Sequence, residues 1–386
     1  MRLQYILSNS VLLALAAPRI ATAEWSTFHG NNQRNGLTSI VAPAVPRIKW
    51  SYDAKGPVIS SPVVCPDGSI IVGATWEETK KPSMNLLAIR ADGTLKWKFK
   101  LAWIENVTMS TPTVGADGRV YFGTPSGELI CLNSYGVEQW RYSANSGVQS
   151  HILLAQDGNL YVQLDGKLTS FTTSGQKRWE FDLGINMPGG PTETLSGKIL
   201  AVGTGIYCFN TDGTQLWHSN VAGTAASVAV SPNGDVIVGG NSVSGLNPLT
   251  GATKWDAGIS AYGTYGSPAV DSQGNVYYGF DYNLYKISSN GNLLMHQYLD
   301  DPFSNYLGHT YCSPLIDGAG RIYLGLGSGK RWAIDYEKAM LVLNGSLVTT
   351  ATVTFPEIPF TSSPAIGSDG TLYIGCLDGK LYALGN

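Results

Sequence analysis

A pattern of short apolar runs separated by polar turns repeats along most of the chain. Each copy passes through an Asp-Gly-type turn into an alternating strand such as Arg119–Phe122, and then into a third strand such as Leu129–Leu132. A second turn, for example Asp92-Gly93, leads to a fourth strand that usually carries a tryptophan. Asp-Gly pairs between alternating apolar runs are strong hairpin signals, because the turn needs a positive φ that glycine tolerates. The pattern therefore predicts four short antiparallel strands in each copy.

The number of copies follows from the glycine of the first turn. This glycine recurs eight times at spacings of 37 to 50 residues, at Gly68, Gly118, Gly158, Gly197, Gly234, Gly274, Gly320 and Gly370. Four-stranded repeats of this length, with aromatic residues at fixed places, are typical of β-propeller blades. We predict an all-β fold: an eight-bladed β-propeller of four-stranded antiparallel blades.

The tryptophans indicate how the ring closes. Fourth-strand tryptophans end copies one to five, and Met295 and Thr349 are taken to occupy the same place in copies six and seven. Copy eight stops after three strands at Asn386, whereas Arg47–Tyr52 precedes copy one as a strand without a blade. We predict that this N-terminal strand, with Trp50, completes the last blade and leaves no open sheet edge.

In the repeat family that these copies resemble, a small third-strand residue lies under the tryptophan of the blade, and the resemblance implies the same contact, with the tryptophan buried, here. The positions are Ala88, Cys131, Ser170, Cys208, Gly245, Lys286, Val342 and Ala383. Lys and Val fall in the two copies that lack tryptophan, which supports a packed contact between the two positions.

The N-terminus has the features of a secretory signal. Residues 1–23 combine Arg2, an apolar core at 11–17 and an Ala-x-Ala site ending at Ala23. We predict cleavage after Ala23, a single propeller domain over residues 24–386, and a periplasmic or secreted location. The first cysteine is Cys65, so the sequence has no lipobox for a lipid anchor, and no other segment is long enough to span a membrane.

Composition narrows the possible partners. Charged residues make up 14% of the chain, the net charge is −3, and there is no basic stripe, so we do not expect nucleic acid as a partner. We expect a monomer. The five cysteines have no metal-ligand spacing, and most are expected to be free thiols; Cys65 and Cys376 lie in neighbouring blades, and whether they pair stays open.

These repeats resemble the pyrroloquinoline-quinone-type (PQQ-like) repeat propellers. The best matches are Gly379–Leu384, and Leu86–Ile89 followed by Trp97, and the segment Trp25–Gly36 resembles the start of many secreted members. The resemblance implies the propeller fold but not one function. The family contains quinoprotein dehydrogenases and also non-catalytic scaffolds, such as the propeller lipoprotein of the bacterial outer-membrane barrel-assembly machinery.

Loop length is the main clue to a site. Turns between first and second strands, and between third and fourth strands, open on one face and are short, whereas the other connections open on the opposite face. The long ones belong to blades six, seven, eight and one, and function concentrates in such loops. Their candidate binding residues are Trp76, Glu77, Lys80, Trp103, Asp300, Asp301, His309, Arg331, Trp332, Asp335 and Tyr336.

Three functions remain open at this point, and we favour the first. It is an exported, non-catalytic propeller that binds an envelope or extracellular protein through the loop-rich face. The alternatives are a PQQ-dependent oxidoreductase, with PQQ and calcium as cofactors, and a protein that binds or acts on carbohydrate. We expect no PQQ cofactor and no bound metal, because the quinone has three carboxylates and the eight innermost strands contain no Lys or Arg, with Glu193 and His151 as their ionisable residues. Whether the chain is an enzyme is left undecided.

Overall fold

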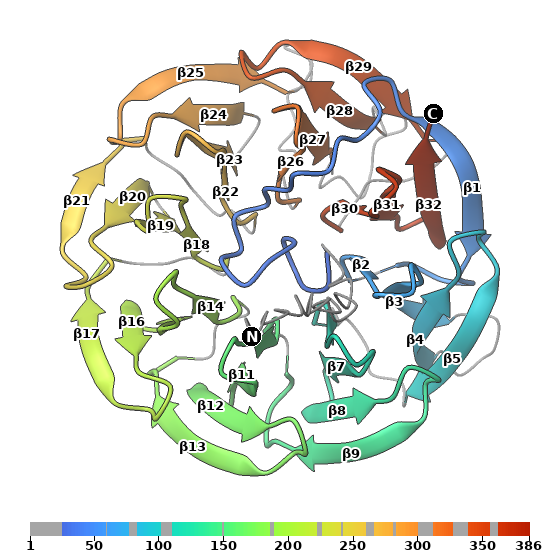
Figure 1. The fold of residues 1–386 in the computed structure, drawn as a ribbon, viewed down its shortest axis with the longest axis horizontal. Coiled ribbons are helices and arrows are strands. Elements are labelled where there is room, and N and C mark those ends of the chain that lie inside the picture. Colours follow the sequence, from blue (N-terminus) through green and yellow to red (C-terminus); the bar gives the residue numbers. More distant parts are fainter. Residues whose placement is uncertain are drawn as a thin grey trace, which may run out of the picture.

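Eight four-stranded antiparallel sheets surround a central axis (Figure 1). The structure is a computed structural model, and it describes residues 25–386 except 59, 77–82, 102–109, 149, 186–188, 222–225, 241, 260–265, 281–282, 300–311, 327–338 and 356–361. In these described ranges no helix is long and apolar enough to cross a bilayer. The predicted eight-bladed β-propeller is confirmed.

Each blade runs from a two-residue strand at the axis to a longer strand at the rim. Blades 1 to 4 contain, in this order, β2 (Val63–Val64), β3 (Ile70–Trp76), β4 (Ser83–Ile89), β5 (Leu95–Leu101); β6 (Thr113–Val114), β7 (Val120–Gly123), β8 (Glu128–Leu132), β9 (Glu138–Ser143); β10 (Leu153–Leu154), β11 (Asn159–Leu164), β12 (Lys167–Thr172), β13 (Lys177–Asp182); β14 (Thr192–Glu193), β15 (Ile199–Val202), β16 (Ile206–Phe209), β17 (Gln215–Ser219).

The second half of the ring repeats this order. Blades 5 to 8 contain β18 (Ala229–Val230), β19 (Val236–Gly239), β20 (Val243–Leu246), β21 (Thr253–Asp256); β22 (Ala269–Val270), β23 (Val276–Phe280), β24 (Asn283–Ile287), β25 (Leu293–Tyr298); β26 (Leu315–Ile316), β27 (Ile322–Gly325), β28 (Ala339–Leu343), β29 (Thr349–Thr354); β30 (Ala365–Ile366), β31 (Leu372–Gly375), β32 (Lys380–Gly385) and β1 (Arg47–Asp53).

Blade 8 combines the two ends of the chain. Its sheet order is β1-β32-β31-β30, and β1 pairs antiparallel with β32, with Trp50 opposite Ala383. Figure 1 shows β1 in blue beside the red C-terminal strands. The predicted closure by the N-terminal strand is confirmed.

The glycines of the first turn confirm the repeat count. All eight have φ between 74° and 92°. This is the left-handed region, which glycine enters without the steric penalty of a Cβ atom. One short turn therefore starts the second strand of every blade.

One residue assignment in copy seven is wrong. Ala351, and not Thr349, lies opposite Val342 at the place of the tryptophans. The shift arises in the preceding turn, where Leu347, with φ 55°, takes the left-handed position that glycine takes in other blades. Gly345 in the same turn does not have a positive φ.

The tryptophans lie opposite the predicted third-strand residues, but they are less buried than expected. Trp217 is 7% exposed, whereas the other fourth-strand tryptophans are half-buried, because the fourth strand is the outermost of its blade. Each indole covers the turn between the third and fourth strands of the next blade. A Cβ atom built on Gly136 of blade 2, for example, would lie 2.6 Å from the indole of Trp97 in blade 1. The tryptophans thus link neighbouring blades.

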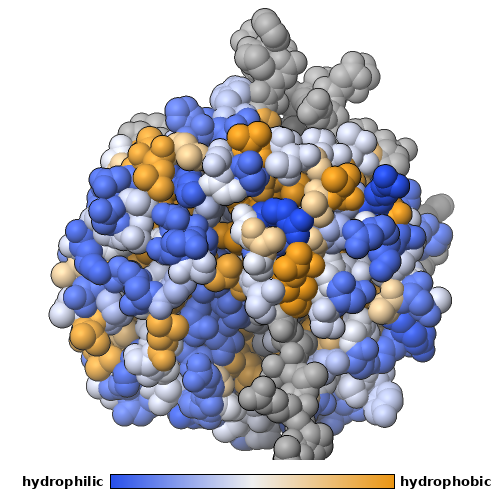
Figure 2. Space-filling view, turned by 45° about the horizontal axis from the view of Figure 1, so that its top comes forward, coloured by the Kyte–Doolittle hydropathy of each residue, from blue (hydrophilic) through white to orange (hydrophobic). Residues whose placement is uncertain are grey.

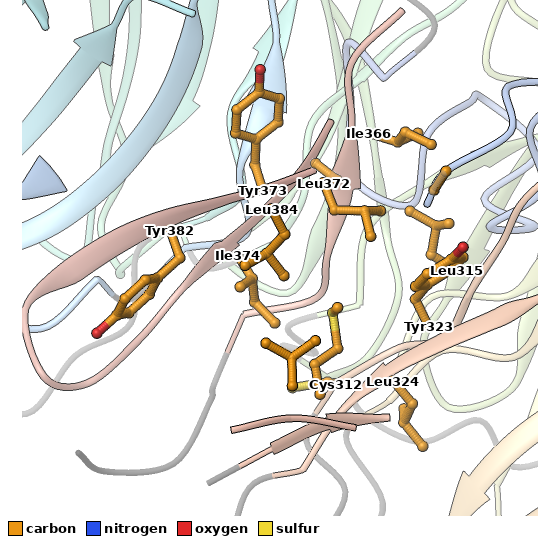
Figure 3. Close-up of a cluster of buried hydrophobic side chains, with 14 of the residues drawn as sticks. Cys312, Leu315, Tyr323, Leu324, Ile366, Leu372, Tyr373, Ile374, Tyr382 and Leu384 are labelled. Carbon is orange, nitrogen blue, oxygen red and sulfur yellow. The ribbon is translucent and has the colours of Figure 1, made fainter. Parts of the chain in front are cut away.

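The apolar cores continue from blade to blade. Figure 3 shows Cys312, Leu315 and Leu324 of blade 7 close to Ile374 and Leu384 of blade 8. All five cysteines are buried and none forms a disulfide, so Cys65 and Cys376 are not paired with each other. On the outside, hydrophobic residues are scattered in small groups among hydrophilic ones on the face in view (Figure 2). Such scattered exposure is ordinary for a folded protein.

Candidate binding site on the axis and the connection face

The predicted loop residues fall in the expected kind of connection. Trp76 ends β3, and Glu77 and Lys80 lie between β3 and β4. The others follow the fourth strands of blades 1 and 6 or the second strand of blade 7, namely Trp103 (between β5 and β6), Asp300, Asp301 and His309 (between β25 and β26), and Arg331, Trp332, Asp335 and Tyr336 (between β27 and β28). Only the backbone of Trp76 belongs to the described residues, so the role of these side chains stays a prediction.

The opposite end of the axis carries a feature that sequence reasoning missed. The segment Trp25–Ala42, which we name the axial segment, crosses the centre of the ring (blue in Figure 1). Its carbonyl groups accept hydrogen bonds from the second residue of the innermost strand in six blades; these residues are Val64, Val114, Glu193, Val230, Val270 and Ile316. Asn32 reaches blade 3 by donating to the carbonyl of Leu154 at 2.9 Å.

These contacts have a simple physical cause. The innermost strand of every blade has one edge without a neighbouring strand, and its buried backbone groups need partners. The axial segment provides them at the turn end of the strands, where residues such as Cys65–Gly68 follow directly. The described part of this segment therefore lies at the turn end of the axis, away from the connection face.

Arg34 places a positive charge on the axis. Its guanidinium is 0% exposed and donates to the carbonyls of Pro191, Ile152 and Phe28 and to the Thr27 hydroxyl, at 2.9–3.1 Å. Burial lowers the pKa of Arg34 to about 9, so it remains charged at neutral pH. The innermost strands do lack Lys and Arg, and the axial segment supplies the cation instead.

Two imidazoles lie close to Arg34. His29 contacts the carbonyls of Arg34 and Pro314, each at 2.7 Å, and burial together with the Arg34 charge lowers its pKa to about 4. His151 stacks on Phe28 with ring centroids 3.8 Å apart, and its Nδ1 accepts a hydrogen bond from the backbone N–H of Thr111 at 3.3 Å. Burial and the positive charge of Arg34 hold the pKa of His151 well below its usual value. The lowered pKa values favour the neutral form of both rings at pH 7, and a neutral His29 has one N–H to donate to one of its two carbonyl neighbours.

Glu193 fixes the axial segment from the other side. It is 1% exposed, accepts a hydrogen bond from Asn32 at 2.7 Å, and also accepts from the backbone N–H of Gln156 at 3.1 Å. Burial raises its pKa. The two ionisable residues predicted on the innermost strands, Glu193 and His151, thus both contact the axial segment.

A relay of hydroxyl groups surrounds the axis nearer to the connection face. The backbone N–H of one blade donates to the serine hydroxyl of the next, at 2.8–3.1 Å, in the order Gly190, Ser227, Ser267, Ser313, Ser363 and Ser61. The serine two residues before proline has a different role. In blade 2, for example, the Ser110 hydroxyl accepts from the N–H of Gly123 in its own blade at 2.6 Å. The Ser-Ser pairs before proline, at 60–61 and 362–363, thus combine one bond within a blade with one between blades.

The polar and charged side chains on the described axis therefore mainly stabilise the fold. Among the described residues, no group of three or more His, Cys, Asp or Glu side chains is placed to hold a metal ion. Arg34 and His29 lie in Trp25–Gly36, which the sequence marks only by its resemblance to the start of secreted family members. Its polar side chains do not alternate as in a strand, and which backbone groups they meet depends on the closed ring.

The family model described as outer membrane protein assembly factor BamB matches residues 83–205 and 165–384, which together cover more than half of the chain. The chain belongs to this PQQ-like repeat family. No curated protein sequence matches it.

Solved structures with the same fold differ widely in function. BamB from Moraxella catarrhalis is 14% identical, with a TM-score of 0.64 over 89% of this chain and 98% of that one. Quinohemoprotein alcohol dehydrogenase from Comamonas testosteroni is 11% identical, with a TM-score of 0.69 over 94% and 81%. The C-terminal WD40 domain of Sif2 is 12% identical, with a TM-score of 0.67 over 89% and 98%. At these identities the likeness concerns the fold alone.

Proposed function

We propose that the protein is an exported, monomeric, non-catalytic binding propeller. It engages an envelope or extracellular protein through the connection face of blades six, seven, eight and one. The signal at residues 1–23 would direct the chain to the periplasm or the exterior, with the mature protein starting at Glu24. The family description as an assembly factor agrees with a role in protein binding.

The proposal rests on the observation that the axis is filled by the protein's own N-terminal segment. The axial segment contacts seven blades at the turn end, and Arg34, His29 and Glu193 all have partners within the protein. In other proteins such groups could take part in catalysis, but in this protein Arg34, His29 and Glu193 hold the axial segment in place. What remains for a partner is the opposite face, where the long connections carry Trp, Tyr and Arg, the residues that most often dominate binding surfaces.

The described axis residues do not fit PQQ as a cofactor. The quinone carries three carboxylates, which need cationic partners when they are buried. Arg34 is the cation on the described axis, and it already makes four hydrogen bonds to backbone carbonyls and a hydroxyl.

A crosslinking experiment tests the protein-binding role. The mature chain, expressed in its native envelope, is compared with the triple variant Trp76→Ala, Arg331→Ala and Trp332→Ala. We expect one stoichiometric protein partner to be captured by the wild type and lost in the variant. Tyr135→Ala, a change at a residue 77% exposed on the turn face, is the control and should retain the partner.

Two results would overturn the proposal. The first is unchanged capture by the triple variant. The second is stoichiometric binding of PQQ with calcium, together with dye-linked oxidation of an alcohol or sugar. If the same substitutions abolished binding of an oligosaccharide and not of a protein, the ligand class would be carbohydrate.

A further inference from the structure

A cavity of about 740 Å³ lies between blades 6 and 7 on the turn face. Its walls are the first turns of the two blades, the Leu37–Ser39 stretch of the axial segment, and Lys286 with Gly345. The corresponding groove between blades 1 and 2 has a volume of about 330 Å³ and is lined in part by Trp97. Blade 6 has Met295 at the place of that tryptophan, so no indole occupies the corresponding space.

Lys286 replaces the missing indole N–H but brings more donors. In five other blades the indole donates to a turn carbonyl of the next blade, as Trp97 does to Ser134 at 3.0 Å. Here the Lys286 ammonium donates to the carbonyl of Gly345 at 2.6 Å and lies 5.5 Å from the centre of the Tyr277 ring. An ammonium group has three N–H donors. Lys286 therefore has two donors left on the wall of the cavity, and it forms no ion pair with the described residues.

The carboxylates beside Lys286 are already satisfied. Asp271 accepts hydrogen bonds from the backbone of Gln273 and Asn275, from the Asn275 amide and from the Tyr277 hydroxyl. Asp317 is paired with Arg321 at 2.8 Å and accepts a bond from the backbone of Ala42. Since these carboxylate oxygens already accept hydrogen bonds, the polar group left to bind a ligand in the cavity is the hydrogen-bond donor Lys286.

We propose that this cavity binds a singly charged oxyanion attached to an apolar group, with the Lys286 ammonium as its partner. An ammonium and a carboxylate form a charge-assisted hydrogen bond, which is stronger than a neutral one. The nearby charge of Asp271 disfavours more highly charged ligands, and Leu37 and Tyr277 provide apolar wall. Small carboxylic acids and the C-terminal carboxylate of a peptide share this chemistry. The site lies on the turn face and is independent of the function proposed above.

The test measures binding of matched acids and amides to the mature protein by titration calorimetry. The probes are N-acetylphenylalanine, its amide, and a pentapeptide ending in phenylalanine with a free or an amidated C-terminus. We expect only the acids to bind, and Lys286→Met to weaken binding at least tenfold, about 1.4 kcal/mol. Lys254→Met, which removes a lysine paired with Asp235 in blade 5, is the charge control and should bind like the wild type.

A second variant protects the test against misfolding. Lys286→Ala with Met295→Trp recreates the Ala–Trp pair that blade 1 uses at these positions, so it should fold while losing the site. Tighter binding of the peptide than of the small acid would assign a chain end as the ligand, and equal binding a small molecule. Amides that bind as well as acids, or unchanged binding by Lys286→Met, would overturn the proposal.

Discussion

The rim contacts divide the ring into two unlike sectors. From blade 8 through blade 1 to blade 6, each interface has a tryptophan that covers a turn glycine of the next blade. The interfaces between blades 6 and 7 and between blades 7 and 8 have Met295 and Ala351 at that position. In this second sector the hydroxyl relay at the axis is continuous, through Ser313 and Ser363. Neighbouring blades are thus linked at the rim, at the axis or at both.

The interface between blades 7 and 8 explains why a tryptophan would have no use there. The third and fourth strands of blade 8, β32 and β1, come from opposite ends of the chain, so no turn joins them. An indole on blade 7 would have no turn glycine to cover. The axial segment and the residues after it take over: the Tyr323 hydroxyl donates to Pro43 at 2.9 Å, and Arg321 donates to the carbonyl of Ala42. At this interface the contacts therefore follow the local backbone and not the sequence repeat.

The largest effect is expected from removing the N-terminal residues, which contact both sectors. Deleting residues 24–53 removes β1 together with the axial segment, and leaves seven innermost strands without their partners. We expect the protein to lose cooperative unfolding, as measured by thermal circular dichroism on the purified mature chain. A melting temperature within a few degrees of the full mature chain would contradict this.

The next largest effect is expected from substitutions at the rim position of the fourth strand, one in each sector. Trp217→Ala should destabilise the protein by about 3–5 kcal/mol, the usual result for truncating a large buried side chain, because Trp217 is 7% exposed and donates to Pro248. Ala351→Trp should give no gain, because blade 8 has no matching turn. Both are measured by urea unfolding. A clear stabilisation by Ala351→Trp would show that the comparison of the sectors is wrong.

A pH experiment tests the axis within the tryptophan-linked sector. The pKa of His151 is lowered in the folded protein. Its imidazole is therefore protonated near pH 6.5 in the unfolded chain but stays neutral at this pH in the folded protein. Folding stability should therefore fall as the pH is lowered below about 6.5. His151→Ser, which introduces the hydroxyl that other blades have, should reduce the fall between pH 7 and pH 5, as followed by urea unfolding. An unchanged pH dependence would exclude His151 as its source.

The smallest effect concerns the last tryptophan of the series. The indole N–H of Trp255 is buried and has no hydrogen-bond partner among the described residues, whereas that of Trp179 donates to Thr211 at 3.0 Å. Gly245 lies under Trp255, and a Cβ atom there would be 2.3 Å from the indole, so this ring sits closer to its own blade. Trp179→Phe should cost about 1 kcal/mol more than Trp255→Phe, the net value of one hydrogen bond, in matched urea titrations. Equal costs would contradict this reading.

The sequence by itself determined the architecture. The eight turn glycines, the alternating strands and the unpaired strand around Trp50 are local signals, because a positive φ or a two-residue period needs no distant partner to be recognised. They suffice for the blade number and for the closure of the ring. The loop-rich face also followed from the sequence, because the spacing of strands along the chain gives the length of every connection.

Only the tertiary structure decided what the axis contains. Arg34, in the axial segment, and Glu193, on an inner strand, are far apart in sequence and carry no motif. Both nevertheless hold this segment against the blades, because the inner strands of seven blades converge on it. The missing tryptophan of copy seven, and the lysine of copy six, could be seen in the sequence but not explained. Their reasons lie in what the neighbouring blade offers, and neighbours are defined only when the ring is closed.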